Sequence, residues 1–291
     1  WVEQTLNNLK ARYVRIIVKG NSANGNTQAR EIELYSAEGT DVSTTNANKA
    51  TSNNSTNNQS SNTVTTGNRD NSLVDFFEDF EDGKLSDSFS CSGNCPTVST
   101  EQALNGRYAM RSQVTSSMSN QKRAEVVPKS STGVRSMEFE KDYWFGFSVY
   151  IPTNWTTPPG FEIPFQIHEP SGGTQPTLAL YTGSGTWKVK TEGQGFGKDE
   201  KFLNKVSDDK GKWVDFVVQY RPSYKGTGVA KVWKDGSLVY SRTGNTAGNY
   251  VGGTYAKFGI YKGNLEDNNV LYHDDIRITA NPKAGYKDVA P

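Results

Sequence analysis

Through the C-terminal three quarters of the chain, short runs of alternating apolar and polar residues are separated by turn residues, which is the pattern of β-strands. In the run 143–151, Phe145 and Phe147 share one face and are expected to enter a hydrophobic core. The segment 229–240 predicts a hairpin with an Asp235-Gly turn. Further strands are expected at residues 74–80, 213–220, 255–261 and 272–278.

The sequence predicts no long amphipathic helix. Many short strands, together with 6 Trp, 14 Tyr, 13 Phe and 28 Gly, favour an all-β fold. We therefore expect a β-sandwich or a jelly roll. One sheet of such a sandwich has a concave face that is long enough to hold a polymer.

The chain changes composition sharply before these strands. Asn, Ser and Thr supply 23 of the 33 residues from 40 to 72, which predicts a flexible linker because such a segment cannot bury enough apolar surface to fold. The strand-like runs 13–18 and 31–35 resemble the last strands of a discoidin-type carbohydrate-binding module, and an unrelated hairpin is the alternative. We expect a C-terminal remnant of such a module at 1–39 and a jelly-roll domain at 73–291.

Charge and hydropathy exclude several classes of protein. With 32 Lys and Arg against 31 Asp and Glu, the 291 residues carry a net charge of +1, which argues against a nucleic-acid partner. No apolar stretch approaches the roughly 18 residues of a membrane span, so no membrane partner is expected. Residues 73–291 hold 25 basic and 25 acidic side chains, which argues against a heavily sulfated ligand.

The two cysteines, Cys91 and Cys95, lie in the polar segment Cys-Ser-Gly-Asn-Cys. Two thiols are too few for a structural zinc site, so a small disulfide-closed loop is predicted, with two free thiols as the alternative. A disulfide implies an oxidising compartment, and we expect a secreted, extracellular or periplasmic protein. The chain begins with Trp, which we interpret as a mature or trimmed form.

Three runs each place polar side chains on one strand face and apolar side chains on the other. They are Arg123-Ala-Glu125, Gln166-Ile-His168 and Lys257-Phe-Gly-Ile-Tyr261. If the three strands are neighbours in a sheet, Arg, Gln, His, Lys and Tyr side chains meet on one face.

That set of side chains suits β-elimination beside a uronic acid. The enzyme must remove the C5 proton, neutralise the adjacent carboxylate and protonate the leaving oxygen. Arg and Gln can neutralise the carboxylate, His or an ionised Tyr can take the proton, and Tyr can return one. Ionising a free Tyr near neutral pH costs roughly 4 kcal/mol, which a cation such as Lys257 or Arg123 would reduce.

The three runs resemble the signatures of the jelly-roll polysaccharide lyases, the group of heparin lyase I, glucuronan lyase and the alginate lyases. The alginate enzymes continue the last run with Asn-Gln, whereas this chain has Lys262-Gly. Lys257-Phe-Gly-Ile-Tyr261, with Trp213-Val-Asp-Phe and Trp233-Lys-Asp-Gly, is closer to the heparin and glucuronan lyases. The resemblance covers about residues 73–291 and implies an all-β, concanavalin-like β-jelly-roll sandwich.

The resemblance implies a role for each matching residue. Gln166 and Arg123 would neutralise the substrate carboxylate. His168 and Tyr261 would be the base and the acid, with Lys257 supporting Tyr261 or binding substrate. Members of this lyase group differ in whether the tyrosine acts as both the base and the acid.

We expect an endo-acting lyase that leaves a 4,5-unsaturated uronate at the new non-reducing end. The expected partner of this monomeric protein is an acidic polysaccharide, with glucuronan-like β-1,4-glucuronate first, alginate second and heparin-like chains third. Further substrate-binding side chains are predicted at Glu125, Trp144, Tyr150, Lys188, Lys190 and Tyr255. For the aromatic residues packing is the alternative, and for the lysines a solvated strand face.

Catalysis of this kind needs no cofactor. A structural calcium ion is predicted at Glu78, Glu81 and Asp274, because carboxylates suit calcium and related sandwiches tie their first and last strands together with it. Plain surface acids are the alternative.

Two other functions compete with a lyase. A glycoside hydrolase needs paired carboxylates across the scissile bond, and the usual Glu-x-Asp-x-x-Glu or Glu-x-Asp-x-Glu strand pattern is absent. A non-catalytic carbohydrate-binding module needs aromatic platforms but not the Arg, Gln, His and Tyr set.

Overall fold

The computed structural model describes residues 71–115, 117, 122–170, 175–193, 196–249, 252–263 and 268–291. The predicted module remnant at 1–39 and nearly all of the predicted linker at 40–72 lie outside these residues, so both stay predictions.

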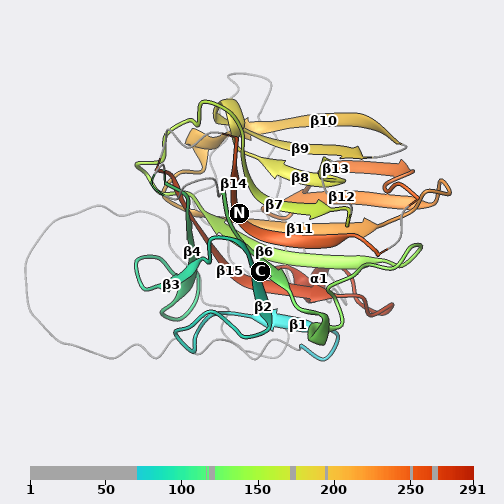
Figure 1. Ribbon diagram of the computed structural model, residues 1–291, viewed down its shortest axis with the longest axis horizontal. Coiled ribbons are helices and arrows are strands. Elements are labelled where there is room, and N and C mark those ends of the chain that lie inside the picture. Colours follow the sequence, from blue (N-terminus) through green and yellow to red (C-terminus); the bar gives the residue numbers. More distant parts are fainter. Residues whose placement is uncertain are drawn as a thin grey trace, which may run out of the picture. The chain divides into compact units, whose positions relative to one another are not determined.

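The described strands form two antiparallel sheets (Figure 1). The supporting sheet contains, in spatial order, β13 (Ser237–Gly244), β12 (Gly228–Lys234), β11 (Trp213–Arg221), β6 (Tyr143–Tyr150), β15 (Val270–Thr279), β4 (Ala109–Gln113) and β3 (Thr97–Ser99), and β1 (Phe76–Glu78) also pairs with β15. The cleft sheet contains β10 (Phe196–Lys205), β9 (Thr186–Gly193), β8 (Leu178–Tyr181), β7 (Glu162–His168), β14 (Tyr255–Lys262), β5 (Arg123–Pro128) and β2 (Phe89–Gly93).

Helical structure in the described residues is limited to short segments. They are the α-helix α1 (Tyr286–Val289) and 3-10 turns at Ser130–Thr132, Gly183–Gly185 and Val206–Asp208. No helix in this part of the chain is long and apolar enough to cross a membrane.

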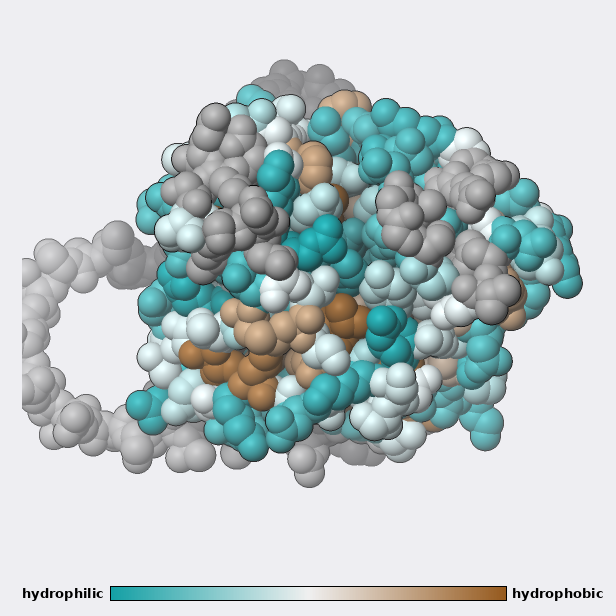
Figure 2. Space-filling model, viewed as in Figure 1, coloured by the Kyte–Doolittle hydropathy of each residue, from teal (hydrophilic) through white to brown (hydrophobic). Residues whose placement is uncertain are grey.

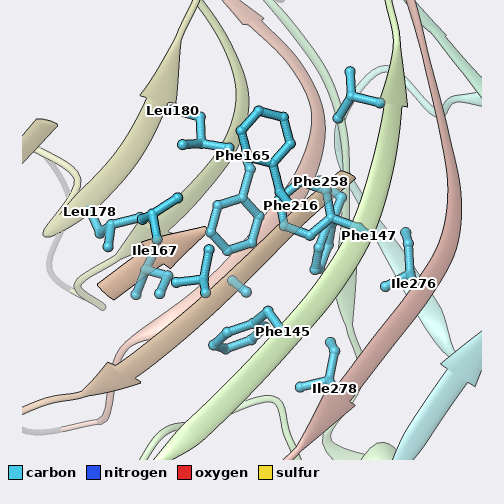
Figure 3. Packing of buried hydrophobic residues seen from close by; sticks show 14 of the residues in the cluster. Phe145, Phe147, Phe165, Ile167, Leu178, Leu180, Phe216, Phe258, Ile276 and Ile278 are labelled. Atoms are coloured by element: carbon cyan, nitrogen blue, oxygen red, sulfur yellow. The ribbon is translucent and has the colours of Figure 1, made fainter. Parts of the chain in front are cut away.

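Aromatic and aliphatic side chains from both sheets fill the space between them (Figure 3). Phe147 of the supporting sheet packs on Phe165 of the cleft sheet with ring centroids 4.7 Å apart, and Phe258 meets Phe147 edge-on at 5.3 Å. All three are fully buried, and each contributes about 1.5–3 kcal/mol through loss of apolar contact with water. The predicted all-β sandwich is confirmed, and with it the predicted core face of β6.

The predicted hairpin joins β12 to β13. Asp235 and Gly236 have φ values of 47° and 78°, the left-handed pair that a tight two-residue hairpin turn requires. With the apolar side chains largely in the core, the face of the molecule in Figure 2 is mostly hydrophilic, apart from a hydrophobic patch.

Candidate active site

The three polar runs lie on adjacent strands of the cleft sheet, with β14 between β7 and β5. Lys257 stands opposite Gln166 across the β14–β7 pair, and Tyr261 stands opposite Arg123 across the β14–β5 pair. Because side chains alternate along each strand, this register gathers the polar residues on the face away from the core. The structure therefore brings together the residues that the sequence grouped.

A β-bulge at Gly259 sets the position of Tyr261. The pairing of β14 with β7 shifts between Phe258 and Tyr261, whereas its pairing with β5 stays regular. Gly259 has a φ of +140°, and a Cβ atom there would lie 2.2 Å from the carbonyl oxygen of Ala124. Only glycine fits this close approach, so the bulge depends on the glycine in the Lys-Phe-Gly-Ile-Tyr run.

A cleft of about 640 Å³ opens on this face. Six of the predicted site residues line it: Arg123, Gln166, His168, Tyr261, Lys188 and Lys190. The lining also contains residues that the sequence did not indicate, among them Phe161, Gln175, Tyr181 and Glu200. Phe161 and Gln175 lie in loops, Tyr181 lies on β8 and Glu200 lies on the edge strand β10, so none of the four belongs to the three polar runs.

The cleft crosses the strands rather than following one of them. Gln166, Ala179 and Lys190 stand opposite one another on β7, β8 and β9. Lys257 on β14 and Glu200 on β10 extend the same row at its two ends. A polymer lying along this row would meet a different strand at each step.

Glu125 lies beneath the cleft rather than in it. Its side chain is only 1% exposed, and it accepts a 2.5 Å hydrogen bond from Nε2 of Gln166. A guanidinium nitrogen of Arg123 lies 3.6 Å from its carboxylate, and Nζ of Lys257 lies 3.9 Å away. The prediction that Glu125 contacts substrate is therefore corrected. Its buried carboxylate instead interacts with Gln166, Arg123 and Lys257 and holds their side chains in position.

Burial acts in opposite directions on this acid and its lysine partner. It raises the pKa of Glu125, against the attraction of Lys257, the hydrogen bond from Gln166 and the attraction of Arg123. It lowers the pKa of Lys257, against the attraction of Glu125. In the described part of the chain, Oε1 of Gln166 and Oε2 of Glu125 are buried without a hydrogen-bond partner.

The predicted disulfide is confirmed, and it borders this cluster. Cys91 and Cys95 are bonded, and the described residues contain no free cysteine. Ser92 lies within the closed loop, on β2, and its hydroxyl accepts a 3.4 Å hydrogen bond from Nζ of Lys257. The disulfide thus restrains a strand that contacts the buried lysine.

Tyr261 and His168 are held by different contacts. The Arg123 guanidinium lies 4.2 Å from the centroid of the Tyr261 ring, and Phe161 meets that ring edge-on at 5.3 Å. Nδ1 of His168 lies 2.7 Å from the carbonyl oxygen of Glu169. A carbonyl only accepts hydrogen bonds, so this contact fits the tautomer with the proton on Nδ1 and the basic lone pair on Nε2.

Tyr255 lies beside the cleft, opposite His168 on the neighbouring strand, and does not line it. The Arg135 guanidinium stacks 4.1 Å from the centroid of the Tyr255 ring, and Nζ of Lys257 lies 5.4 Å from the same centroid. Burial raises the pKa of the Tyr255 hydroxyl, against the attraction of Arg135 and Arg123. Arg135 lies in a loop between strands, so the alternation of strand residues could not identify it as a site residue. It adds positive charge to this end of the site.

The structure does not bring Trp144 and Tyr150 to the cleft. Both lie on β6 of the supporting sheet, on the face opposite the core residues Phe145 and Phe147. Trp144 packs on Trp233 at 5.8 Å, and Tyr150 packs on Trp213 at 5.5 Å. The prediction that they stack on sugar rings in the cleft is corrected, because alternation identifies a strand face but not the sheet to which the strand belongs.

The predicted calcium residues do not form a shared ligand set. Glu81 accepts hydrogen bonds from the backbone amides of Arg107 and Tyr108, and Asp274 accepts them from Leu104 and Asp275. Glu78 likewise binds the amide of Phe80. Among the described residues, no group of three or more His, Cys, Asp or Glu side chains is arranged to hold a metal ion. The calcium ion stays a prediction without support from these donors.

Comparison with solved structures identifies proteins of the same fold. An endo-β-1,4-glucuronan lyase from Trichoderma reesei is 17% identical, with a TM-score of 0.57 over 75% of this chain and 98% of that chain. Alginate lyase A1-II′, a member of polysaccharide lyase family 7, is 15% identical, with a TM-score of 0.46 over 68% of this chain and 86% of that chain. The binding domain of Paraclostridial mosquitocidal protein 1 is 9% identical, with a TM-score of 0.50 over 72% of this chain and 49% of that chain.

The similarity to the glucuronan lyase shows the fold, and the fold alone does not decide between catalysis and binding. No significant match was found among curated protein sequences. A family model described as polysaccharide lyase matches residues 37–277, which is most of the chain. The chain therefore belongs to this polysaccharide lyase family.

Proposed function

We propose that this protein cleaves polyuronate chains by β-elimination, with glucuronan-like β-1,4-glucuronate as the first substrate. The observation that carries the proposal is that Arg123, Gln166, His168 and Tyr261 line one cleft. Membership of the polysaccharide lyase family supports the reaction class.

Each step of the elimination has a side chain of suitable chemistry. Arg123 and Gln166 bind the carboxylate at C5, which lowers the pKa of the C5 proton by stabilising the carbanion. Nε2 of His168 removes that proton. The electron pair forms the C4–C5 double bond as the C4–O bond breaks, and Tyr261 donates its proton to the leaving oxygen. The base and the acid then exchange their protons with solvent.

The electrostatics of the site support a substrate that carries carboxylates. Arg123 and Lys257 lie within 4 Å of the buried Glu125, and Arg135 stacks on the neighbouring Tyr255, so three cations accompany one buried acid at this end of the cleft although residues 73–291 are neutral overall. At the other end, Lys188 lies 3.5 Å from Glu200 and Lys190 lies 2.5 Å from Glu192, so these lysines are neutralised. A polymer with one carboxylate per sugar suits this distribution of charge better than heparin does. Glucuronan is our first candidate substrate and alginate the second.

Two further properties belong to the same proposal. A cleft that crosses the strands suits internal cleavage of a long chain, so we propose an endo mode. The disulfide favours an oxidising compartment, so we propose that the enzyme acts outside the cytoplasm.

Ultraviolet absorbance during incubation with glucuronan, alginate, heparin and heparan sulfate tests the proposal. Elimination conjugates a C4–C5 double bond to the carboxylate, which absorbs, whereas hydrolysis does not. We expect the absorbance to rise fastest with glucuronan. New reducing ends without absorbance would identify a hydrolase, and binding without either signal would identify a binding protein. Both outcomes would overturn the proposal.

A further inference from the structure

An aromatic side chain stands exposed on the cleft face, just beyond the lining of the cleft. Phe202 is 58% exposed and lies on β10, the last strand at one end of the cleft sheet (Figure 1). It stands opposite Lys188 on β9, and Lys188 stands opposite Tyr181 on β8. Lys188 and Tyr181 both line the cleft, so Phe202 continues their row by one strand.

Neighbouring groups hold this ring in place while leaving much of it accessible. Nζ of Lys188 lies 4.5 Å from the ring centroid and 3.5 Å from Oε1 of Glu200. The cation therefore occupies one side of the ring and is itself neutralised. Leaving a phenyl ring exposed to water forfeits stabilisation that burial would provide. An exposed ring that is oriented by a lysine on a substrate-binding face indicates a binding surface.

We propose that Phe202, with Lys188, forms a distal subsite that stacks on the apolar face of a pyranose ring of the bound polyuronate. The inference rests on the proposed function and extends it to a second contact far from the reaction. Tyr261 on β14 and Phe202 on β10 are separated by four strand spacings, ~19 Å, which corresponds to several sugar units. Since Glu200 neutralises Lys188, this subsite selects for ring shape rather than for extra negative charge.

The test compares Phe202→Ala with Leu238→Ala, a matched control. Leu238 is the other large hydrophobic side chain that stands exposed in the described residues, at 52%, and it lies on β13 of the supporting sheet. Steady-state cleavage is measured on glucuronan and alginate oligosaccharides of increasing length. For long chains, we expect Phe202→Ala to raise KM roughly three- to tenfold, with a smaller effect on chains too short to reach β10. Phe202→Tyr, which keeps the ring, should restore the long-chain KM.

A binding measurement separates failure of this inference from failure of the proposed function. Calorimetry with the same oligosaccharides is repeated in the Tyr261→Phe background. Equal KM and equal affinity for Phe202→Ala and Leu238→Ala at every chain length would overturn the subsite. If the wild-type protein cleaves none of the polymers, the proposed elimination fails. Calorimetry then decides on the subsite alone, and weaker long-chain binding by Phe202→Ala would support it.

Discussion

Tyr261 is the side chain on which the proposed chemistry depends most directly. Its ring is fixed by Arg123 and Phe161, so removing the hydroxyl removes a proton donor without removing the packing. The kinetic effect should therefore be separable from the effect on binding.

Replacing Tyr261 with Phe should lower kcat on glucuronan by about 10²- to 10⁴-fold, because general acid catalysis typically contributes that much. The affinity for oligosaccharides should change by less than about threefold, since the cleft keeps its carboxylate-binding groups. Stopped absorbance assays and calorimetry measure the two quantities. Tyr224→Phe is the control, because Tyr224 packs on Phe139 away from the cleft. Equal losses in kcat and affinity would contradict the assignment.

Glu125 acts through its neighbours, and its substitution should change the pH profile. Glu125→Gln removes the attraction that opposes desolvation of Lys257, so the pKa of Lys257 falls further. Lys257 then loses its proton at a lower pH, and the alkaline limb of kcat/KM should move to lower pH. The free energy of unfolding should fall by about 3 kcal/mol, since the buried Lys257 loses its counter-charge. A pH profile that keeps its shape while stability falls would indicate a purely structural role.

At the scale of strands, the site depends on how β14 pairs with its two neighbours. Alternation in the sequence fixed which residues of β5, β7 and β14 face away from the core, and this part of the site was predictable. Alternation does not identify the edge strands β2 and β10, because an edge strand pairs on one side only and tolerates polar and charged residues throughout. Glu200 and Phe202 were missed for that reason.

The bulge in β14 gives an element-scale prediction. Gly259→Ala should lower the free energy of unfolding by about 2–4 kcal/mol, because it combines a strained φ with a clash against Ala124. It should also lower kcat, because Tyr261 follows the bulge by two residues. Chemical denaturation and absorbance assays measure both effects. Gly197→Ala is the matched control, since a Cβ there meets nothing within 4 Å. Equal stability of the two variants would refute the account of the bulge.

At the scale of the whole molecule, the two sheets enclose one core, and a titratable group lies inside it. His273 on β15 is fully buried, and its Nε2 lies 3.0 Å from the carbonyl oxygen of Pro164 on β7. This contact links the supporting sheet to the cleft sheet. Burial lowers the pKa of His273 to about 4 from an ordinary value near 6.5.

Proton uptake by His273 makes the stability of the folded protein depend on pH. Between pH 6.5 and 4 the unfolded chain protonates this histidine and the folded chain does not, so stability is lost as the pH falls. The full effect is about 3 kcal/mol. Burial raises the pKa of the adjacent Asp274 to about 7, which acts in the opposite direction over a similar range. His273→Gln keeps a donor but does not titrate.

Thermal melts at a series of pH values compare His273→Gln with the wild-type protein. The stability of the variant, relative to wild type, should rise by about 3 kcal/mol between pH 7 and pH 4. A constant difference across this range would mean that His273 has the same pKa in the folded and the unfolded protein.

The row of side chains that crosses β14, β7, β8, β9 and β10 has a consequence for redesign. Each strand contributes one position to the row, and the backbone hydrogen bonds of the sheet hold these positions independently of side-chain identity. Gln166, Lys190 and Glu200 of this row line the cleft, so substituting one of them should alter one contact with the substrate and leave its neighbours in register. Substrate preference can therefore be adjusted one strand at a time, without changing how the strands pair.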